Sequence, residues 1–154
     1  MRNISTKLVI SVAIAAVGAF AADNSIGTWK LNMEKSKFTP SAPVKSLSAT
    51  REASDGGVKV TMTGERADGT PINGSYSAKF DGKDNPVTGA PYDMIAIKQV
   101  NANTFTFKAK NTGNKYTSAG RLVVSKSGKT MTQTSKGTSA EGKPFSYTFV
   151  YDKQ

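Results

Sequence analysis

The sequence has 154 residues and contains neither cysteine nor histidine. Without cysteine, the chain has no disulfide framework, no thiolate nucleophile and no Cys-based metal site. Without histidine, it also lacks the imidazole that most often serves as a general base and as a transition-metal ligand. These two absences exclude most of the familiar zinc and hydrolase chemistries. A chain of this length is expected to form one domain.

Long apolar runs are also scarce, and the single one lies at the start of the chain. Arg2 and Lys7 form a positive segment before a 13-residue apolar stretch, 8–20, and Ala19-Phe20-Ala21 matches an A-x-A cleavage site. Thirteen helical residues span about 20 Å, which is short of a bilayer core and disfavours an uncleaved anchor. We therefore expect a signal peptide, 1–21, and one exported domain, 22–154, in the bacterial periplasm or secreted medium.

Acidic residues are few, because 11 Asp and Glu stand against 21 Lys and Arg. Removal of Arg2 and Lys7 lowers the net charge from +10 to +8. The remaining lysines alternate along the sequence rather than forming one run, which is typical of a solvated face. Weak contact with anionic envelope polymers is expected from this charge, but specific nucleic-acid binding is not.

Turn signals recur at short intervals in the expected domain. Asp-Gly and Gly-Asn pairs separate segments in which apolar and polar residues alternate, as in Val58, Lys59 and Val60. This pattern predicts antiparallel strands. The nine expected strands are 26–32, 46–54, 58–66, 71–80, 93–100, 104–111, 115–125, 129–136 and 145–152.

These strands predict an all-β fold, an antiparallel up-and-down β-barrel of 8–9 strands. Closure removes the exposed edges of such a meander, and most links are too short for the cross-over connections of a two-sheet sandwich. An outer-membrane barrel is the other alternative. It needs a continuous outward apolar band and commonly a terminal aromatic residue. Because the chain ends Asp152-Lys153-Gln154 and one strand face is rich in Ser, Thr and Lys, we expect a barrel that does not span a membrane.

The first strand opens with Gly27-Thr28-Trp29. There the chain resembles the calycin superfamily of lipocalins and fatty-acid-binding proteins, and it is also similar to small exported bacterial proteins of unassigned function. The resemblance implies that Gly27 and Trp29 form one end of the barrel, with the tryptophan as a plug. It further implies an arginine from a late strand over the ring. Arg121 is therefore expected to stack on Trp29.

Two features depart from the fatty-acid-binding branch of that superfamily. The segment 34–45 contains Pro40 and Pro43, so it cannot supply the two helices that follow the first strand in those proteins. The last strand reads Tyr147-Thr148-Phe149-Val150-Tyr151 and lacks the Arg-x-Tyr set that holds a carboxylate. Neither the helical lid nor the carboxylate anchor of those proteins is expected here.

Large side chains on the expected inward faces are the candidate ligand-binding residues. A barrel of this size encloses either one small ligand or a packed core, and the pattern does not separate the two. The inward candidates are Met62, Tyr76, Phe80, Ile95, Ile97, Phe105, Phe107, Met131, Phe145, Tyr147 and Phe149.

The longest expected connection is the loop 81–92, whose exposed apolar candidates are Val87 and Tyr92. Asp81, Asp84 and Asp93 lie around it, but no nucleophile motif, phosphate loop or metal-ligand spacing accompanies them. We therefore expect neither catalysis nor a cofactor or metal. The favoured function is binding of a small hydrophobic molecule. The alternative is a packed module that contacts envelope components through its basic surface and the 81–92 loop.

Overall fold

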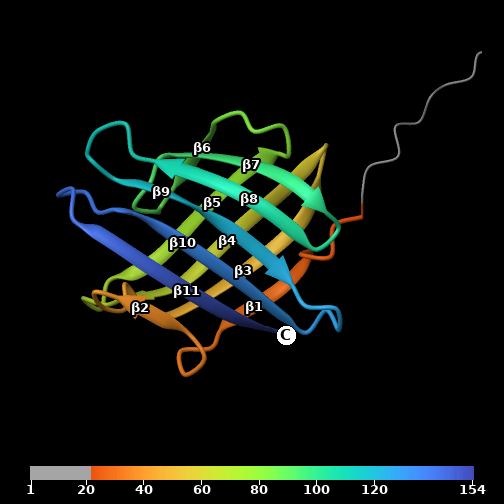
Figure 1. The fold of residues 1–154 in the computed structure, drawn as a ribbon, viewed down its shortest axis with the longest axis horizontal. Coiled ribbons are helices and arrows are strands. Elements are labelled where there is room, and N and C mark those ends of the chain that lie inside the picture. Colours follow the sequence, from red (N-terminus) through yellow and green to blue (C-terminus); the bar gives the residue numbers. More distant parts are fainter. Residues whose placement is uncertain (1–21) are drawn as a thin grey trace, which may run out of the picture.

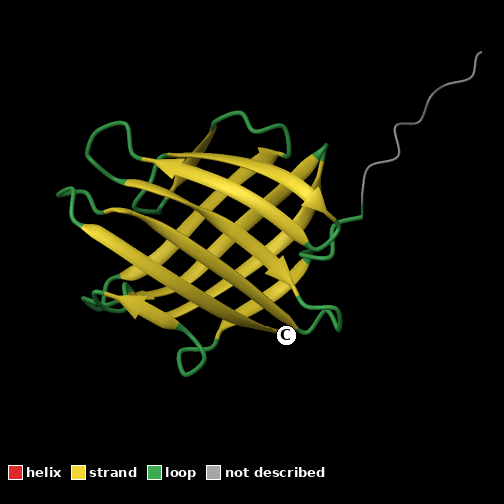
Figure 2. Ribbon diagram, in the orientation of Figure 1, coloured by secondary structure: helices red, strands yellow, loops and turns green. Residues whose placement is uncertain are grey.

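The computed structural model describes residues 22–154, and the expected signal peptide, 1–21, lies outside the described residues. The described chain forms one closed antiparallel barrel (Figures 1 and 2). Each barrel strand pairs with the next along the chain, and β1 closes the barrel by pairing with β11. The ten barrel strands are β1 (Gly27–Leu31), β3 (Val44–Ser54), β4 (Gly57–Arg66), β5 (Pro71–Lys79), β6 (Asn85–Thr88), β7 (Met94–Asn101), β8 (Thr104–Lys110), β9 (Thr117–Val124), β10 (Thr130–Thr138) and β11 (Pro144–Lys153).

The all-β up-and-down barrel is confirmed, but the expected count of 8–9 strands is wrong because ten strands close it. Each of the nine expected segments overlaps a strand. The additional barrel strand is β6, which lies inside the expected 81–92 loop. It pairs with β5 through Ser75 and Tyr76 and with β7 through Met94 and Ile95. Only two residue pairs join β6 to each neighbour, and so short a strand leaves little period-two signal.

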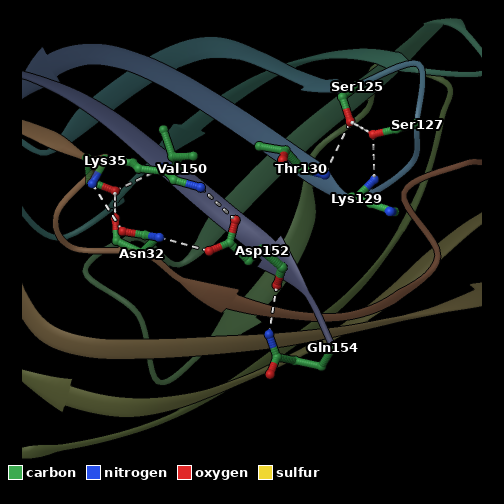
Figure 3. A network of polar contacts seen from close by, with 10 residues as sticks. Asn32, Lys35, Ser125, Ser127, Lys129, Thr130, Val150, Asp152 and Gln154 are labelled. Carbon is green, nitrogen blue, oxygen red and sulfur yellow. Dashed lines mark hydrogen bonds and ion pairs between the residues drawn. The ribbon is translucent and has the colours of Figure 1, made fainter.

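A further, short strand, β2 (Lys37–Thr39), lies beyond the end of β1 and pairs with the same neighbouring strand, β11. β1 pairs with residues 151–153 of β11, and β2 pairs with residues 146–148 of the same strand. The chain bulges away between them at Asn32. The Asn32 side-chain amide donates to Asp152 Oδ2 at 2.8 Å, and Lys35 Nζ lies 3.5 Å from Asp152 Oδ1 (Figure 3). The hydrogen bond from Asn32, together with Lys35, holds the pKa of Asp152 below its usual value.

The two ends of the barrel are made by different sets of connections. We call the closed end the one formed by residues 22–26, 55–56, 80–84, 102–103 and 125–129. We call the open end the one formed by residues 40–43, 67–70, 89–93, 111–116 and 139–143. In Figure 1 the loops after β8 and β10 lie at the left, at the open end, whereas the loop after β9 and the C-terminus lie at the right.

Alternation along the strands places one face of each strand inside. On β4, Val58 and Val60 are buried while Lys59 and Thr61 are exposed, as the period-two pattern predicts. The same pattern recurs on β9, where Leu122 and Val124 are buried. The inward faces of all ten strands thus meet in one interior.

Candidate functional site

The interior of the barrel contains a cavity of about 330 Å³. Its wall is mostly apolar and is supplied by strands from around the whole barrel. Pro43, Ala90, Pro91 and Ala140, which belong to the open-end loops, also line it. The cavity therefore extends from the middle of the barrel to the open end.

The expected inward residues, with one exception, line this cavity. Several of them, including Met62, Tyr76 and Phe107, are only half-buried because they border interior space. The residues of the expected set that line the cavity are Met62, Tyr76, Ile95, Ile97, Phe105, Phe107, Met131, Phe145, Tyr147 and Phe149.

Phe80 is the exception, and its placement corrects the expectation. It follows the last residue of β5 at the closed end and does not line the cavity. Its ring packs against Phe105, with the two ring centroids 5.1 Å apart. Phe80 therefore helps to fill the closed end instead of bordering a ligand space.

Val87 and Tyr92 were expected to be exposed on a loop. The exposure is wrong for both residues, and the loop is wrong for Val87. Val87 lies on β6 and is buried in the core. Tyr92 is half-buried and lines the cavity. The cause for Val87 is β6 itself, because its pairing with β5 and β7 makes this strand part of the barrel wall. Tyr92 lies in the short connection from β6 to β7, at the mouth of the cavity.

The closed end is built around Trp29, whose side chain is fully buried. Its indole Nε1 donates to the backbone oxygen of Ser25 at 2.8 Å. Lys153 Nζ lies 5.5 Å from the centre of the Trp29 ring. Gly27, at φ 138°, permits this arrangement because a Cβ there would come within 2.8 Å of Lys153 Cε.

Arg121 does not stack on Trp29, which corrects the contact that the calycin resemblance implies. Arg121 is exposed on β9, where it pairs with Thr106 and Thr134, while its neighbour Leu122 points inward. The strand alternation therefore places Arg121 on the outer surface. The cation over the tryptophan is Lys153, from the last strand.

Arg51 is a buried interior residue that the sequence interpretation missed. It is 5% exposed, lies on β3 and lines the cavity. Its Nε donates to Ser25 Oγ at 2.9 Å, and Ser25 Oγ donates to Asp23 Oδ1 at 2.5 Å. The available signal was the alternation on β3, which places Arg51 on the same face as Leu47 and Ala49.

Aromatic rings form a continuous wall from the open end toward the middle of the barrel. Tyr92 stacks on Tyr116, Tyr116 on Phe145, and Phe145 on Tyr147, with ring centroids 5.9, 5.7 and 4.5 Å apart. The interplanar angles of these pairs are 27°, 29° and 17°. Such a wall offers apolar, aromatic surface to a guest molecule.

Tyrosine hydroxyl groups are the main polar groups of this wall. Burial raises the pKa of Tyr92 and of Tyr151 well above the usual value, and Tyr76 raises both further, whereas Arg51 lowers both. Burial also raises the pKa of Tyr116 to about 12. Tyr92, Tyr116 and Tyr151 therefore keep their protons at neutral pH and remain hydrogen-bond donors.

Acidic side chains do not form a metal site in the described part of the chain. Within residues 22–154 no three Asp or Glu side chains gather where they could hold a metal ion. In the same residues, no helix has the length and hydropathy that a membrane crossing requires.

No protein-family model matches the chain, and no curated protein matches its sequence. Among solved structures, the chain is similar to a redesigned β-barrel, mFAP1, solved bound to DFHBI. The two share 18% sequence identity with a TM-score of 0.40, and the similarity covers 85% of this chain and 98% of that chain.

Proposed function

We propose that this protein is an exported, non-catalytic binding protein that takes up a small hydrophobic molecule inside its barrel. The observation that carries the proposal is the interior cavity of about 330 Å³, lined mostly by apolar and aromatic side chains and reaching the open end. Sites for small molecules typically have volumes of roughly 300–1,000 Å³ with a few polar groups, so this cavity suits a small ligand.

The alternative, a packed module that acts through its surface, has less support. It requires a filled interior, whereas Met62, Tyr76 and Phe107 border open space. It also requires apolar contact residues on the 81–92 segment, whereas Val87 and Tyr92 point inward. Its remaining feature is the basic outer surface, which attracts anions without specifying a partner.

Two matched substitutions test whether ligands enter the interior. Ala109 lines the cavity on β8, and Ala119 is exposed on the adjacent strand β9. We expect the mature protein to raise the fluorescence of the neutral probe N-phenyl-1-naphthylamine on titration. Ala109→Phe, which fills the cavity, should abolish this uptake, and the same substitution on the outer face, Ala119→Phe, should leave it unchanged.

Native mass spectrometry of the protein purified from its own cell envelope complements the titration. A discrete added mass that survives desalting, followed by organic extraction, would begin to identify the natural ligand. A bare mass, together with no probe uptake by the unmodified protein, would overturn the proposal. Equal uptake by Ala109→Phe would place the probe outside the cavity and would overturn it as well.

A further inference from the structure

Arg51 carries a buried positive charge into the cavity without a direct acidic partner. Between residues 22 and 154 the ion pairs are Lys35–Asp152, Lys45–Glu65 and Lys110–Asp84, and none includes Arg51. Asp23 is linked to Arg51 only through Ser25. Because burying a charge is costly unless it is paired, an arginine in this position favours a negative partner.

The hydrogen-bond donors of Arg51 are only partly used. Nε is bonded to Ser25, and the Cζ atom lies 6.0 Å from the centre of the Phe105 ring. In the described chain, the two terminal amino groups have no hydrogen-bond partner, although they are not sealed from solvent. Arg51 lines the cavity, so these N–H groups are the ones left to bind a guest molecule there. Two parallel N–H groups of a guanidinium match the two oxygens of a carboxylate.

Tyrosine hydroxyls supply further donors near this charge. Tyr76, Tyr92 and Tyr151 all line the cavity. Arg51 acts on the pKa of both Tyr92 and Tyr151, which places these groups within electrostatic reach of one another. The polar residues that line the cavity are thus two arginines, tyrosines, serines and Gln133, with no acidic residue among them, and the Asp23 carboxylate lies behind Ser25. This set suits an anion.

We propose that the ligand is a small apolar acid whose carboxylate binds Arg51 while its apolar body packs against the aromatic wall. This inference rests on the proposed function and adds the chemical class of the ligand. The aromatic side chains of Tyr92, Tyr116, Phe145 and Tyr147 favour an apolar body that aromatic rings can contact. The excess positive charge of the domain draws such an acid toward the barrel.

A second arginine, Arg66, lines the open end and provides an internal comparison. Its Nη1 donates to the backbone oxygen of Pro71 at 2.5 Å, and its Nη2 donates to that of Gly89 at 3.3 Å. Both terminal nitrogens are therefore already bonded to backbone carbonyls. Arg66 is accordingly expected to contribute little to holding the carboxylate, in contrast to Arg51.

The test compares 2-naphthoate with 2-naphthamide, which share a ring system and nearly the same shape but differ in charge. Isothermal titration of the mature protein should show that the acid binds about tenfold or more tightly, as expected for charge-assisted hydrogen bonds. Arg51→Met should remove this preference. Arg121→Met, which deletes an identical charge from the outer surface, and Arg66→Met should retain it.

Equal binding of the acid and the amide by the unmodified protein would overturn the inference, even where Arg51→Met fails to fold. Retention of the preference in Arg51→Met, or its loss only in Arg66→Met, would overturn it as well. Arg51→Lys keeps the charge and should keep most of the preference. If neutral N-phenyl-1-naphthylamine enters the cavity while the acid gains nothing, the proposed function stands and only the acidic ligand is excluded.

Discussion

The two ends of the barrel are built on the same strands but are filled to different degrees. At the closed end, Trp29 and Phe105 are 0% and 1% exposed, and Phe80 packs on Phe105. Toward the open end, Tyr92 and Tyr116 stay half-buried beside open space. One end therefore behaves as a packed core and the other as the wall of a cavity.

The difference comes from the segment that precedes β1. Asn24 N donates to Ala102 O at 2.9 Å, and Gln99 Nε2 donates to Ala22 O at 2.8 Å, so this segment is bonded across the β7–β8 turn. Ser25 is fully buried there and binds Arg51. Residues 22–25, which precede the first strand, thus cover the closed end, whereas the loops of the open end leave the cavity accessible.

The largest expected effect is the loss of stability on truncating an aromatic side chain, which should differ between the two ends. Trp29→Ala should lower the free energy of unfolding by about 3–5 kcal/mol, the range for removal of a large aromatic from a packed core. Phe145→Ala should cost less, because Phe145, although only 7% exposed, borders a cavity that already exists, so its truncation enlarges that space instead of opening a new one in a packed core. Urea unfolding followed by far-UV circular dichroism measures both. Equal costs would show that the open end is as tightly packed as the closed end.

The next expected effect concerns Ser25, in the segment before β1 that covers the closed end. Ser25→Ala removes the acceptor for Arg51 Nε and the donor to Asp23, so it should lower the free energy of unfolding by about 1–3 kcal/mol. Ser127→Ala, at an exposed position of the same end, should change it by less than about 0.5 kcal/mol. Urea unfolding of both variants provides the measurement. A Ser25→Ala protein as stable as the parent would mean that the N-terminal segment does not hold the closed end.

The sequence predicts the strands of this barrel well because alternation and turn residues are local signals. Phe105 and Phe107, separated by one residue, share a face wherever the strand pairs. Strand β6 is not predictable in this way, because only four residues form it and its partners are supplied by β5 and β7. Its assignment depends on pairing, which a single sequence does not display.

The candidate site is harder to predict than the fold. Alternation identifies which residues point inward, but the space between them depends on how ten strands close together. Alternation on β3 also places Arg51 inside, although an interior arginine contradicts the usual preference for apolar residues there. The calycin resemblance directed attention to Arg121, whereas the register of β9 places that residue outside.

The smallest expected effect tests which cation covers the tryptophan. Lys153 is exposed, so its contact with the Trp29 ring should contribute about 0.5–1 kcal/mol. A double-mutant cycle combining Lys153→Met with Trp29→Phe, measured by urea unfolding, should show coupling of this size. The parallel cycle with Arg121→Met should show none, because Arg121 lies on the outer face. Coupling to Arg121 instead of Lys153 would restore the stacking that the calycin resemblance implies, and it would require a different register at the closed end.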